Sequence, residues 1–486
     1  MPAPPPRPAN HPNDRGSALS GGDPLARASP AARGASATIA ALAVAAASNA
    51  LMQTLVVPAI GVLARDLAAS PGAATWVLTA FLLASAILAP LVSSLGDRYG
   101  KRRLLLVVLW VYLVGTLGAM AAWNLGALVG FRAVQGISLA VLPLGFGILR
   151  EALPADRVAL GVGVTSGVLG AGAGVGLVAG GLIVDHASWR WLFALGAATA
   201  VAALWLVVRH VPESTVRSVR RLDLAGSGVL SLALAALLLA LTVGPDRGWT
   251  APATLGLLAV SLVAFVVLPV VERRAADPML ASETFGRRPV LMTHLAAFIW
   301  GFMSFVFYVL LPLLVQLPTG TGLGASVTMT GVLLLPGALV LLPAGAAAAQ
   351  VGGRLGPRAP LAIGLGVAAV GASLLAVSHA SAWQVVGFYL VVGLGSGLAL
   401  AALPRLLGGL VPAARTATAN GVNTVARTVG GAVGAQVAVA VVASRGGVGG
   451  GAPASSAFSA AFWLAVVVAA AGTVVARATT SSAGPH

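Results

Sequence analysis

The residues best placed to do chemistry in this sequence are charged side chains that fall inside long apolar segments. Arg132 and Arg427 each lie well within such a segment, where an arginine costs about 2.5–3.5 kcal/mol on membrane-insertion scales. His294 is a further titratable side chain in one of these segments, close to its end. None of the 13 Asp and Glu residues falls in the middle of a segment. These positions suggest transfer of a proton or binding of a charged solute.

Two interpretations of this charge pattern stay open. A proton-coupled site must take up and release its proton near neutral pH, within reach of both sides of a membrane. Protons could travel through Asp66, Asp97 or His294, with Arg132 tuning the pathway. Alternatively, Arg132 and Arg427 have no buried acid beside them and favour neutral or anionic cargo. We favour the second interpretation slightly.

Polar side chains form rows along two of the apolar segments. Asn49 and Gln53 are four residues apart and share a helical face, and so do Asn420 with Asn423, and Asn423 with Arg427. Such rows either line a polar cavity or join neighbouring helices by hydrogen bonds.

The elements that hold these residues must cross a lipid bilayer. The chain is 58% hydrophobic over 486 residues, more than a soluble protein of this length can bury. About 20 apolar residues at about 1.5 Å each cross the hydrocarbon core. Fourteen runs of this kind are grouped six, two and six, and they predict an all-α integral membrane protein. The runs lie at roughly 37–63, 74–95, 104–122, 125–149, 158–184, 190–208, 224–243, 252–271, 289–316, 327–350, 359–378, 383–408, 417–443 and 457–476.

The basic residues predict the orientation of these segments. With a cytoplasmic N-terminus, 23 of the 29 Lys and Arg residues fall on the inside, which is the bias that the positive-inside rule describes. The outside loops hold four and the segments two: Arg65, Arg190, Arg247 and Arg445, then Arg132 and Arg427. Both termini are therefore expected in the cytoplasm. The net charge of +16 is explained by topology, without nucleic acid.

A basic loop between the second and third segments has a weaker copy later in the chain. Ser94–Arg103 reads SLGDRYGKRR, and its core Arg98–Arg102 corresponds to Arg354–Arg358 at an offset of 256 residues. Three further matches follow in order at offsets of 256 to 258. They pair Gly130-Phe131 and Gly136 with Gly387-Phe388 and Gly393, Pro154 and Arg157 with Pro412 and Arg415, and Gly172 and Gly176 with Gly430 and Gly434. The outer sextets are therefore expected to be repeats related by an axis along the membrane normal, as in many secondary transporters.

The loop resembles the signature that follows the second span in the major facilitator superfamily. The arrangement of six, two and six spans is similar to its 14-span drug:proton antiporter branch, of the QacA/EmrB type. This resemblance covers nearly everything after the N-terminal tail. It implies a major facilitator fold of two six-helix bundles plus two inserted helices.

The resemblance also implies roles for particular residues. Asp97, with Gly100 and the cations Arg98 and Arg102, would form a cytoplasmic latch against the span that starts near Thr416. Arg132 would take part in proton transfer. Gly172, Gly176, Gly180 and Gly181 resemble an antiporter motif, although Leu177 replaces its usual proline. The central cavity would be flanked by Asn49, Gln53, Gln135, Tyr308, Asn420, Asn423 and Arg427.

These patterns predict a domain organisation and a function. A disordered cytoplasmic tail (1–34), an N-terminal bundle (35–210), an inserted pair (211–285), a C-terminal bundle (286–478) and a short tail (479–486) are expected. The predicted function is export of small lipophilic molecules across the cytoplasmic membrane by alternating access, driven by the proton gradient. An uptake porter or uniporter for a small metabolite is an alternative, and so is a non-transporting membrane sensor.

Other functional classes find little support in the sequence. An enzyme would need a metal cluster, a phosphate-binding loop or a nucleophile constellation, none of which the sequence shows. The chain has no cysteine, so thiol chemistry and thiolate metal sites are excluded. We expect no cofactor and no metal, and as partners a small-molecule substrate, protons and the bilayer around a monomer.

Overall fold

The computed structural model describes residues 30–69, 71–214, 223–275, 277, 286–318, 322–444, 454–477 and 479. This part of the chain is helical, without β-strands, and contains 14 helical segments long and apolar enough to cross a membrane. The prediction of 14 spans in an all-α membrane protein is therefore confirmed. The predicted tails 1–34 and 479–486 lie almost wholly outside the described residues.

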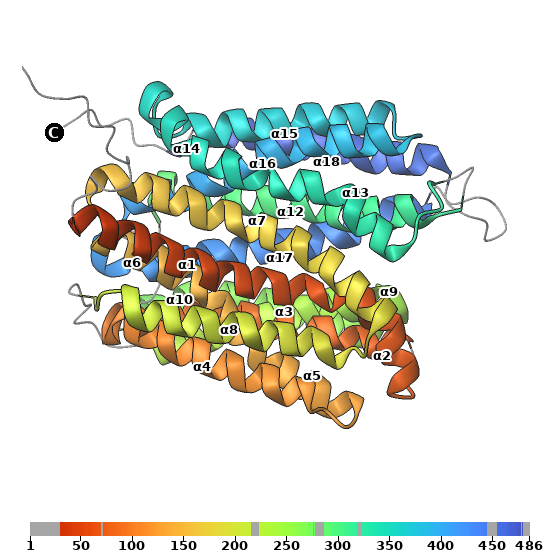
Figure 1. The fold of residues 1–486 in the computed structure, drawn as a ribbon, viewed down its shortest axis with the longest axis horizontal. Coiled ribbons are helices and arrows are strands. Elements are labelled where there is room, and N and C mark those ends of the chain that lie inside the picture. The colour runs from red at the N-terminus through yellow and green to blue at the C-terminus, as the bar shows by residue number, and fades with distance from the viewer. Residues whose placement is uncertain are drawn as a thin grey trace, which may run out of the picture.

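The helices run roughly parallel to one long axis of the molecule (Figure 1). In the N-terminal part they are α1 (Pro30–Leu55), α2 (Ile60–Asp66), α3 (Pro71–Tyr99), α4 (Lys101–Met120), α5 (Leu125–Gln135), α6 (Val141–Ala152), α7 (Ala155–His186) and α8 (Arg190–His210). The middle pair is α9 (Leu224–Arg247) and α10 (Pro252–Arg274). The C-terminal part contains α12 (Arg288–Gln316), α13 (Val327–Leu339), α14 (Leu341–Leu355), α15 (Ala359–Val377), α16 (Ala382–Leu410), α17 (Thr416–Ser444) and α18 (Ser455–Ala476).

Three of the predicted spans are interrupted, and each interruption lies just before a proline. A proline has no N–H to donate to the carbonyl four residues earlier. Pro58 follows the end of α1, Pro143 follows a 3₁₀ turn at Gly136–Ala140, and Pro343 follows the break between α13 and α14. Pro90 lies inside the unbroken α3, so a proline permits such a break without enforcing it.

Buried apolar side chains form two separate cores. One is built from α1 to α8, with Ala417 of α17 added at its edge. The other is built from α12, α13 and α15 to α18, and α14 packs on α16 in a small cluster of its own. We call the two bodies the N-half and the C-half. The residue limits 35–210 and 286–478 stay predictions.

The middle pair packs on the outside of both halves. Leu230 and Leu234 of α9 form a small apolar cluster with Val425 of α17, and α9 also contacts α3. On α10, Leu262 and Val266 are 65% exposed. Apolar side chains so exposed are expected where a helix faces lipid.

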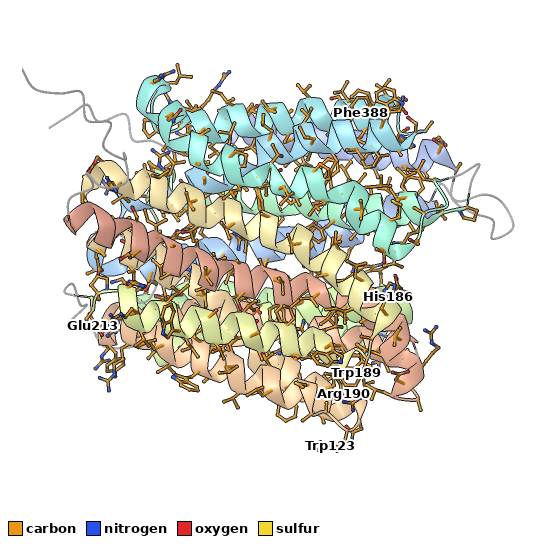
Figure 2. All side chains as sticks on the ribbon, viewed as in Figure 1. Trp123, His186, Trp189, Arg190, Glu213 and Phe388 are labelled. Atoms are coloured by element: carbon orange, nitrogen blue, oxygen red, sulfur yellow. The ribbon has the colours of Figure 1, made fainter. Side chains whose placement is uncertain are left out.

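The two ends of the helix bundle differ in their side chains. We call the end that carries the loop Asp97–Arg103 the basic end. Figure 2 places Glu213 at this end, and Trp123, Trp189 and Arg190 at the opposite end. The Arg190 guanidinium lies 4.3 Å from the Trp189 ring, and Trp123 is 73% exposed. Aromatic side chains of this kind are typical of a membrane interface.

Candidate functional site

Asp97 joins the two halves at the basic end. It lies near the end of α3, and its Oδ2 accepts hydrogen bonds from the backbone N and the Oγ1 of Thr418, both at 2.8 Å. Its Oδ1 accepts a longer bond of 3.3 Å from the backbone N of Ala417. A helix N-terminus has unpaired N–H groups and a positive dipole end, so a carboxylate there is stabilised. Asp97 is 2% exposed, which removes these bonds from competition with water.

Lys101 is the cation that faces Asp97. Its Nζ lies 3.0 Å from Asp97 Oδ1 and 2.6 Å from Glu151 Oε1, and the lysine is fully buried. Gly147 of α6 leaves room for this side chain, since a Cβ there would lie 2.7 Å from Lys101 Cδ. We call Asp97, Lys101, Glu151 and Thr418 the latch.

The prediction that Arg98 and Arg102 pair with Asp97 is corrected by this geometry. Arg98 lies over the ring of its neighbour Tyr99, at 5.1 Å from the centroid. Arg102 donates to the carbonyl of Val208 on α8 at 2.9 Å. The reason is spacing: Lys101 lies four residues after Asp97, where side chains meet, whereas Arg98 and Arg102 lie one and five residues after it.

The break between α3 and α4 depends on Gly100, which has a φ of 108°. L-residues with a side chain rarely adopt this conformation. The copy of the loop has the same turn at Gly356, with a φ of 92°. The acid is not duplicated, because Gly353 stands where Asp97 stands in the first loop. The repeat therefore keeps the backbone turn and loses the carboxylate.

A second contact between the halves lies beside the latch. Arg150, on α6, donates from Nη1 to the carbonyl of Val411 at 2.9 Å and to Oγ1 of Thr416 at 2.6 Å. Both acceptors lie at the start of α17 or in the turn before it. The basic end is thus closed by charged and polar contacts from two N-half helices onto one C-half helix.

Arg132 is held by its own half. Its Nε donates to the carbonyl of Val77 at 3.0 Å and its Nη1 to Oε1 of Gln135 at 2.7 Å. The guanidinium lies 4.5 Å from the centroid of the Phe81 ring, and the side chain is fully buried. Gln135 in turn donates to Oγ1 of Thr116 at 2.9 Å. In Arg132, Nη2 has no hydrogen-bond partner.

The predicted antiporter glycines pack mainly inside the N-half. A Cβ at Gly172, Gly176 or Gly180 would press on the backbone of α1, at Ala47, Leu51 or Leu55 respectively. Gly181 instead faces Thr328 at the start of α13, where a Cβ would lie 2.9 Å from Oγ1. Small residues allow such close helix packing in membranes.

A second row of glycines on α7 faces the C-half. Cβ atoms at Gly163, Gly167 and Gly174 would press on Gly345, on Leu342 and on Ala338. The α7 helix therefore contacts α14 and α13 along most of its length.

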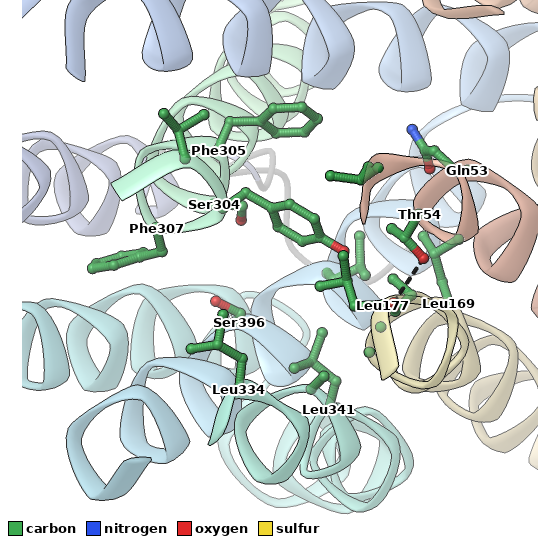
Figure 3. A pocket seen from close by; sticks show the side chains of 18 of the residues that line it. Gln53, Thr54, Leu169, Leu177, Ser304, Phe305, Phe307, Leu334, Leu341 and Ser396 are labelled. Carbon is green, nitrogen blue, oxygen red and sulfur yellow. Dashed lines mark hydrogen bonds between the residues drawn. The ribbon is translucent and has the colours of Figure 1, made fainter. Parts of the chain in front are cut away.

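A cavity of about 340 Å³ lies between the halves. Figure 3 shows Gln53 and Thr54 of α1 on one side and Ser304 and Phe305 of α12 across from them. Its lining is mostly apolar and aromatic and contains two cations and no acid. The aromatic and charged lining residues are Phe81, Arg132, Trp300, Phe305, Phe307, Tyr308, Tyr389 and Arg427.

Of the seven predicted cavity residues, Gln53, Tyr308 and Arg427 line this cavity. The other four lie outside its lining, and hydrogen bonds account for each of them. Asn49 accepts from Ser138, Gln135 pairs with Arg132, Asn420 donates to the carbonyl of Thr416, and Asn423 donates to the carbonyl of Thr293. Asn49 and Asn423 follow the alternative in which polar rows join helices, whereas the bond of Asn420 stays within α17.

Arg427 projects into the cavity from the middle of α17 and differs from Arg132 in its contacts. Its guanidinium lies 5.7 Å from the centroid of the Trp300 ring. Its backbone is fixed against α12, since a Cβ at Gly301 would clash with the Arg427 carbonyl. No hydrogen bond or ion pair of its side chain occurs within the described part of the chain.

The other two candidates for proton coupling lie away from the cavity lining. Asp66 ends α2 at the end of the molecule opposite to the latch, where it is exposed. His294 is half-buried, and its Nδ1 lies 3.4 Å from Nδ2 of Asn423. Neither side chain lines the cavity.

Several residues of this site were not predicted from the sequence. Lys101 is the chain's single lysine, which was a usable signal. Arg150 and Glu151 lie shortly before Pro154 in the sequence. No sequence pattern distinguishes them from the other charged residues expected in cytoplasmic loops. Trp300 and the Gly163 row resemble common membrane-helix packing, and only the folded structure assigns them to the cavity and to the interface between the halves.

Comparison with known proteins gives consistent matches. The sequence profile described as the Major Facilitator Superfamily matches residues 42–435. The chain is 30% identical over 422 residues to the tetracenomycin C resistance and export protein of Streptomyces glaucescens, covering 84% of this chain and 76% of the relative. It is 27% identical over 399 residues to multidrug resistance protein 3 of Bacillus subtilis, covering 80% and 76%. A solved proton:xylose symporter of the same superfamily has a TM-score of 0.64 at 14% identity, covering 90% of this chain and 94% of that one.

Proposed function

Because this chain belongs to the Major Facilitator Superfamily, we propose that it exports small lipophilic molecules from the cell by alternating access. The chain is a transporter and not an enzyme. The two relatives named above are a resistance and export protein and a multidrug resistance protein, and the match covers about three quarters of the length of each. The cavity between the two halves carries the proposal for this chain, since it is closed at the basic end by the latch.

The cavity lining suits lipophilic cargo. Six aromatic rings and many aliphatic side chains surround a space of about 340 Å³, which is within the usual range for small-molecule sites. Ser304, Ser396 and Thr428 offer hydroxyl groups among the lining residues. A lining of this kind binds by shape and apolar contact, with few groups that fix one particular ligand.

We place the basic end in the cytoplasm and the protein in the cytoplasmic membrane. The loop Asp97–Arg103 lies at this end, together with most of the other cations in the described part of the chain, and the positive-inside rule assigns such an end to the cytoplasm. In this orientation the latch closes the cytoplasmic side. The conformation described here would then be closed to the cytoplasm, as expected after the cargo has been released to the outside and before the cavity opens to the cytoplasm again.

Export is proposed to be driven by the proton gradient. No carboxylate lines the cavity, so protons would have to bind elsewhere. Asp97 of the latch is the buried carboxylate that joins the halves, whereas Asp66 is exposed and His294 is half-buried. Arg132, held next to the cavity, would tune the pathway by its charge.

Accumulation of ethidium and of tetracenomycin C in cells tests this proposal. Cells that produce the protein should hold less of at least one compound than cells with the empty vector, and a protonophore should remove the difference. Unchanged accumulation of both compounds would contradict export. Reduced accumulation that a protonophore does not alter would contradict coupling to protons. The Asp97→Asn variant, produced at the same level, serves as a control with weakened export.

A further inference from the structure

The two arginines of the cavity differ in their partners, and this difference bears on the cargo. Arg132 makes two hydrogen bonds within its own half, to Val77 and Gln135, and lies over Phe81. Arg427 has the Trp300 ring beside it, and no hydrogen bond or ion pair of its side chain occurs in the described part of the chain. The first arginine is built into the protein, and the second is available to a ligand.

A cation in this position is expected to have an anionic partner. Removing a charge from water costs several kcal/mol even after relaxation, unless an opposite charge or hydrogen bonds compensate. None of the residues that line the cavity is acidic. An anion carried in by the cargo would provide the compensation that the protein itself does not.

The position of Arg427 is fixed before any ligand arrives. Gly301, Gly430 and Gly434 bring α12 and α17 into backbone contact around it, because a Cβ at any of the three would press on the facing backbone. With the backbone of Arg427 held in place, its guanidinium keeps free donors whose planar geometry matches that of a carboxylate. Pre-ordering of this kind lowers the entropic cost of binding.

The surroundings of Arg427 specify the rest of the ligand. Trp300, Phe305 and Tyr308 line the cavity on the same side, from α12, and the rings of Phe305 and Tyr308 are stacked with centroids 5.9 Å apart. Arg132 of α5 also lines the cavity and adds a second positive charge to its wall. An aromatic body with one acidic group satisfies both features.

We propose that the cavity binds aromatic organic anions, with the carboxylate of the ligand paired to Arg427 and its rings against Trp300, Phe305 and Tyr308. This inference rests on the proposed function, because it names the class of molecule that the exporter carries. It differs from a purely lipophilic cavity in requiring a charge of one sign.

Three probes that share one ring system test the charge requirement: 1-pyrenebutyrate, the neutral 1-pyrenebutanol and 4-(1-pyrenyl)butyltrimethylammonium. Binding to the purified full chain is measured by energy transfer from tryptophan to pyrene, at several detergent concentrations to correct for micelle partitioning. The carboxylate should bind at least tenfold more tightly than the alcohol, and the ammonium probe more weakly than the alcohol. Equal affinities for carboxylate and alcohol in the unaltered protein would overturn the proposal, whether or not any variant folds.

Variants of Arg427 locate the charge. Arg427→Gln should weaken the carboxylate at least tenfold and the alcohol less than twofold, whereas Arg427→Lys should keep most of the preference. Arg65→Gln removes the same charge at an exposed position and should change neither affinity. Equal weakening of both probes in Arg427→Gln would show a structural role and contradict the proposal.

Failure of this proposal is distinguishable from failure of the proposed function. Export of ethidium or tetracenomycin C by a protein without a preference for the carboxylate would leave the exporter in place and remove the anion site. A clear preference for the carboxylate, in a protein that lowers the cellular accumulation neither of 1-pyrenebutyrate nor of ethidium or tetracenomycin C, would leave the anion site and remove the exporter.

Discussion

Two matching interfaces join the halves of this transporter by different chemistry. On one side, α3 meets α17 through the latch, with Gly421 packed on Pro90 and Ser93. On the other side, α14 meets α7 through Gly345 and Gly163. Gly421 lies 258 residues after Gly163, at the same offset as the internal repeat. The first interface therefore adds a buried carboxylate to a glycine contact that both share.

Because the two interfaces differ in chemistry, they should be disrupted by different kinds of substitution. A contact that depends on Asp97 should be sensitive to the loss of charge, because hydrogen bonds to charged groups contribute about 1.5–3 kcal/mol. A contact made by facing glycine backbones should be sensitive to added volume, because overpacking costs about 1–3 kcal/mol or more. The two interfaces share this geometry, and among the described residues only the α3–α17 interface holds a buried carboxylate.

Added volume at the glycine interface should have the largest effect. Gly163→Val places a branched side chain against the backbone of Gly345 and Ala346, so we expect export to fall at least tenfold and the thermal unfolding temperature to fall by several degrees. Gly130→Val is the matched control, since this exposed helical glycine has no heavy atom within 4 Å of an added Cβ. If the two variants behave alike, α7 and α14 do not pack as described.

Loss of charge at the latch should have the next largest effect. Asp97→Asn keeps the shape of the side chain and removes its charge, so we expect about tenfold weaker export. The chain has no cysteine, so Ser93→Cys, buried under the latch, is a unique reporter. Its reaction with N-ethylmaleimide should accelerate about fivefold in the Asp97→Asn background.

Asp156→Asn is the control for this variant, because Asp156 is exposed in the first turn of α7. It should alter neither export nor labelling of the cysteine at position 93. Unchanged labelling in Asp97→Asn would mean that the carboxylate does not hold the basic end closed.

The turns that the two loops share should respond equally to substitution. Gly100→Ala and Gly356→Ala each force a side chain into a positive φ outside the left-handed helical region, which costs about 1–3 kcal/mol. Thermal unfolding of the purified variants should show similar losses of a few degrees. Export should fall further in Gly100→Ala, because only that turn also positions the latch. A loss confined to one of the two variants in thermal unfolding would argue against equivalent turns.

The smallest effects are expected at Arg98 and Arg102, which do not contact Asp97. Arg98→Gln and Arg102→Gln should each change export and labelling of the cysteine at position 93 by less than twofold. Lys101→Met should instead resemble Asp97→Asn, because Lys101 carries the ion pair. An effect of Arg102→Gln as large as that of Asp97→Asn would contradict this geometry and support the pairing of Arg102 with Asp97 that the sequence suggested.

The architecture was predictable because lipid imposes a simple rule on the sequence. Each span needs about 20 apolar residues, and the fourteen runs correspond to the fourteen helical segments. The interruptions were harder to predict. A break in the helix lies just before Pro58, Pro143 and Pro343, whereas α3 continues unbroken through Pro90.

The contacts of the site were predictable only in part. The family resemblance pointed to Arg98 and Arg102, which lie one and five residues after Asp97. Lys101 lies four residues after Asp97 and forms the ion pair, as side-chain spacing along a helix would have predicted. Which residues line the cavity depends on how the two bundles meet. The helical spacing of Asn49 and Asn423 therefore did not reveal that they lie outside the cavity lining. Arg427 was identifiable as a cavity residue, because a charge inside an apolar span is costly and is expected only where it has a functional role.

A disulfide across the latch tests most directly whether the α3–α17 contact must open during transport. Ser93→Cys with Gly421→Cys suits this purpose, because a Cβ at position 421 would lie 3.0 Å from that of Ser93, and a separation of the two helices by about 0.5 Å gives the spacing of a disulfide. Export is measured in proteoliposomes before oxidation, after oxidation and after reduction with dithiothreitol, beside each single variant. We predict that oxidation stops export in the double variant alone and that reduction restores it. Export by the fully cross-linked protein at the rate of the reduced protein would contradict this account.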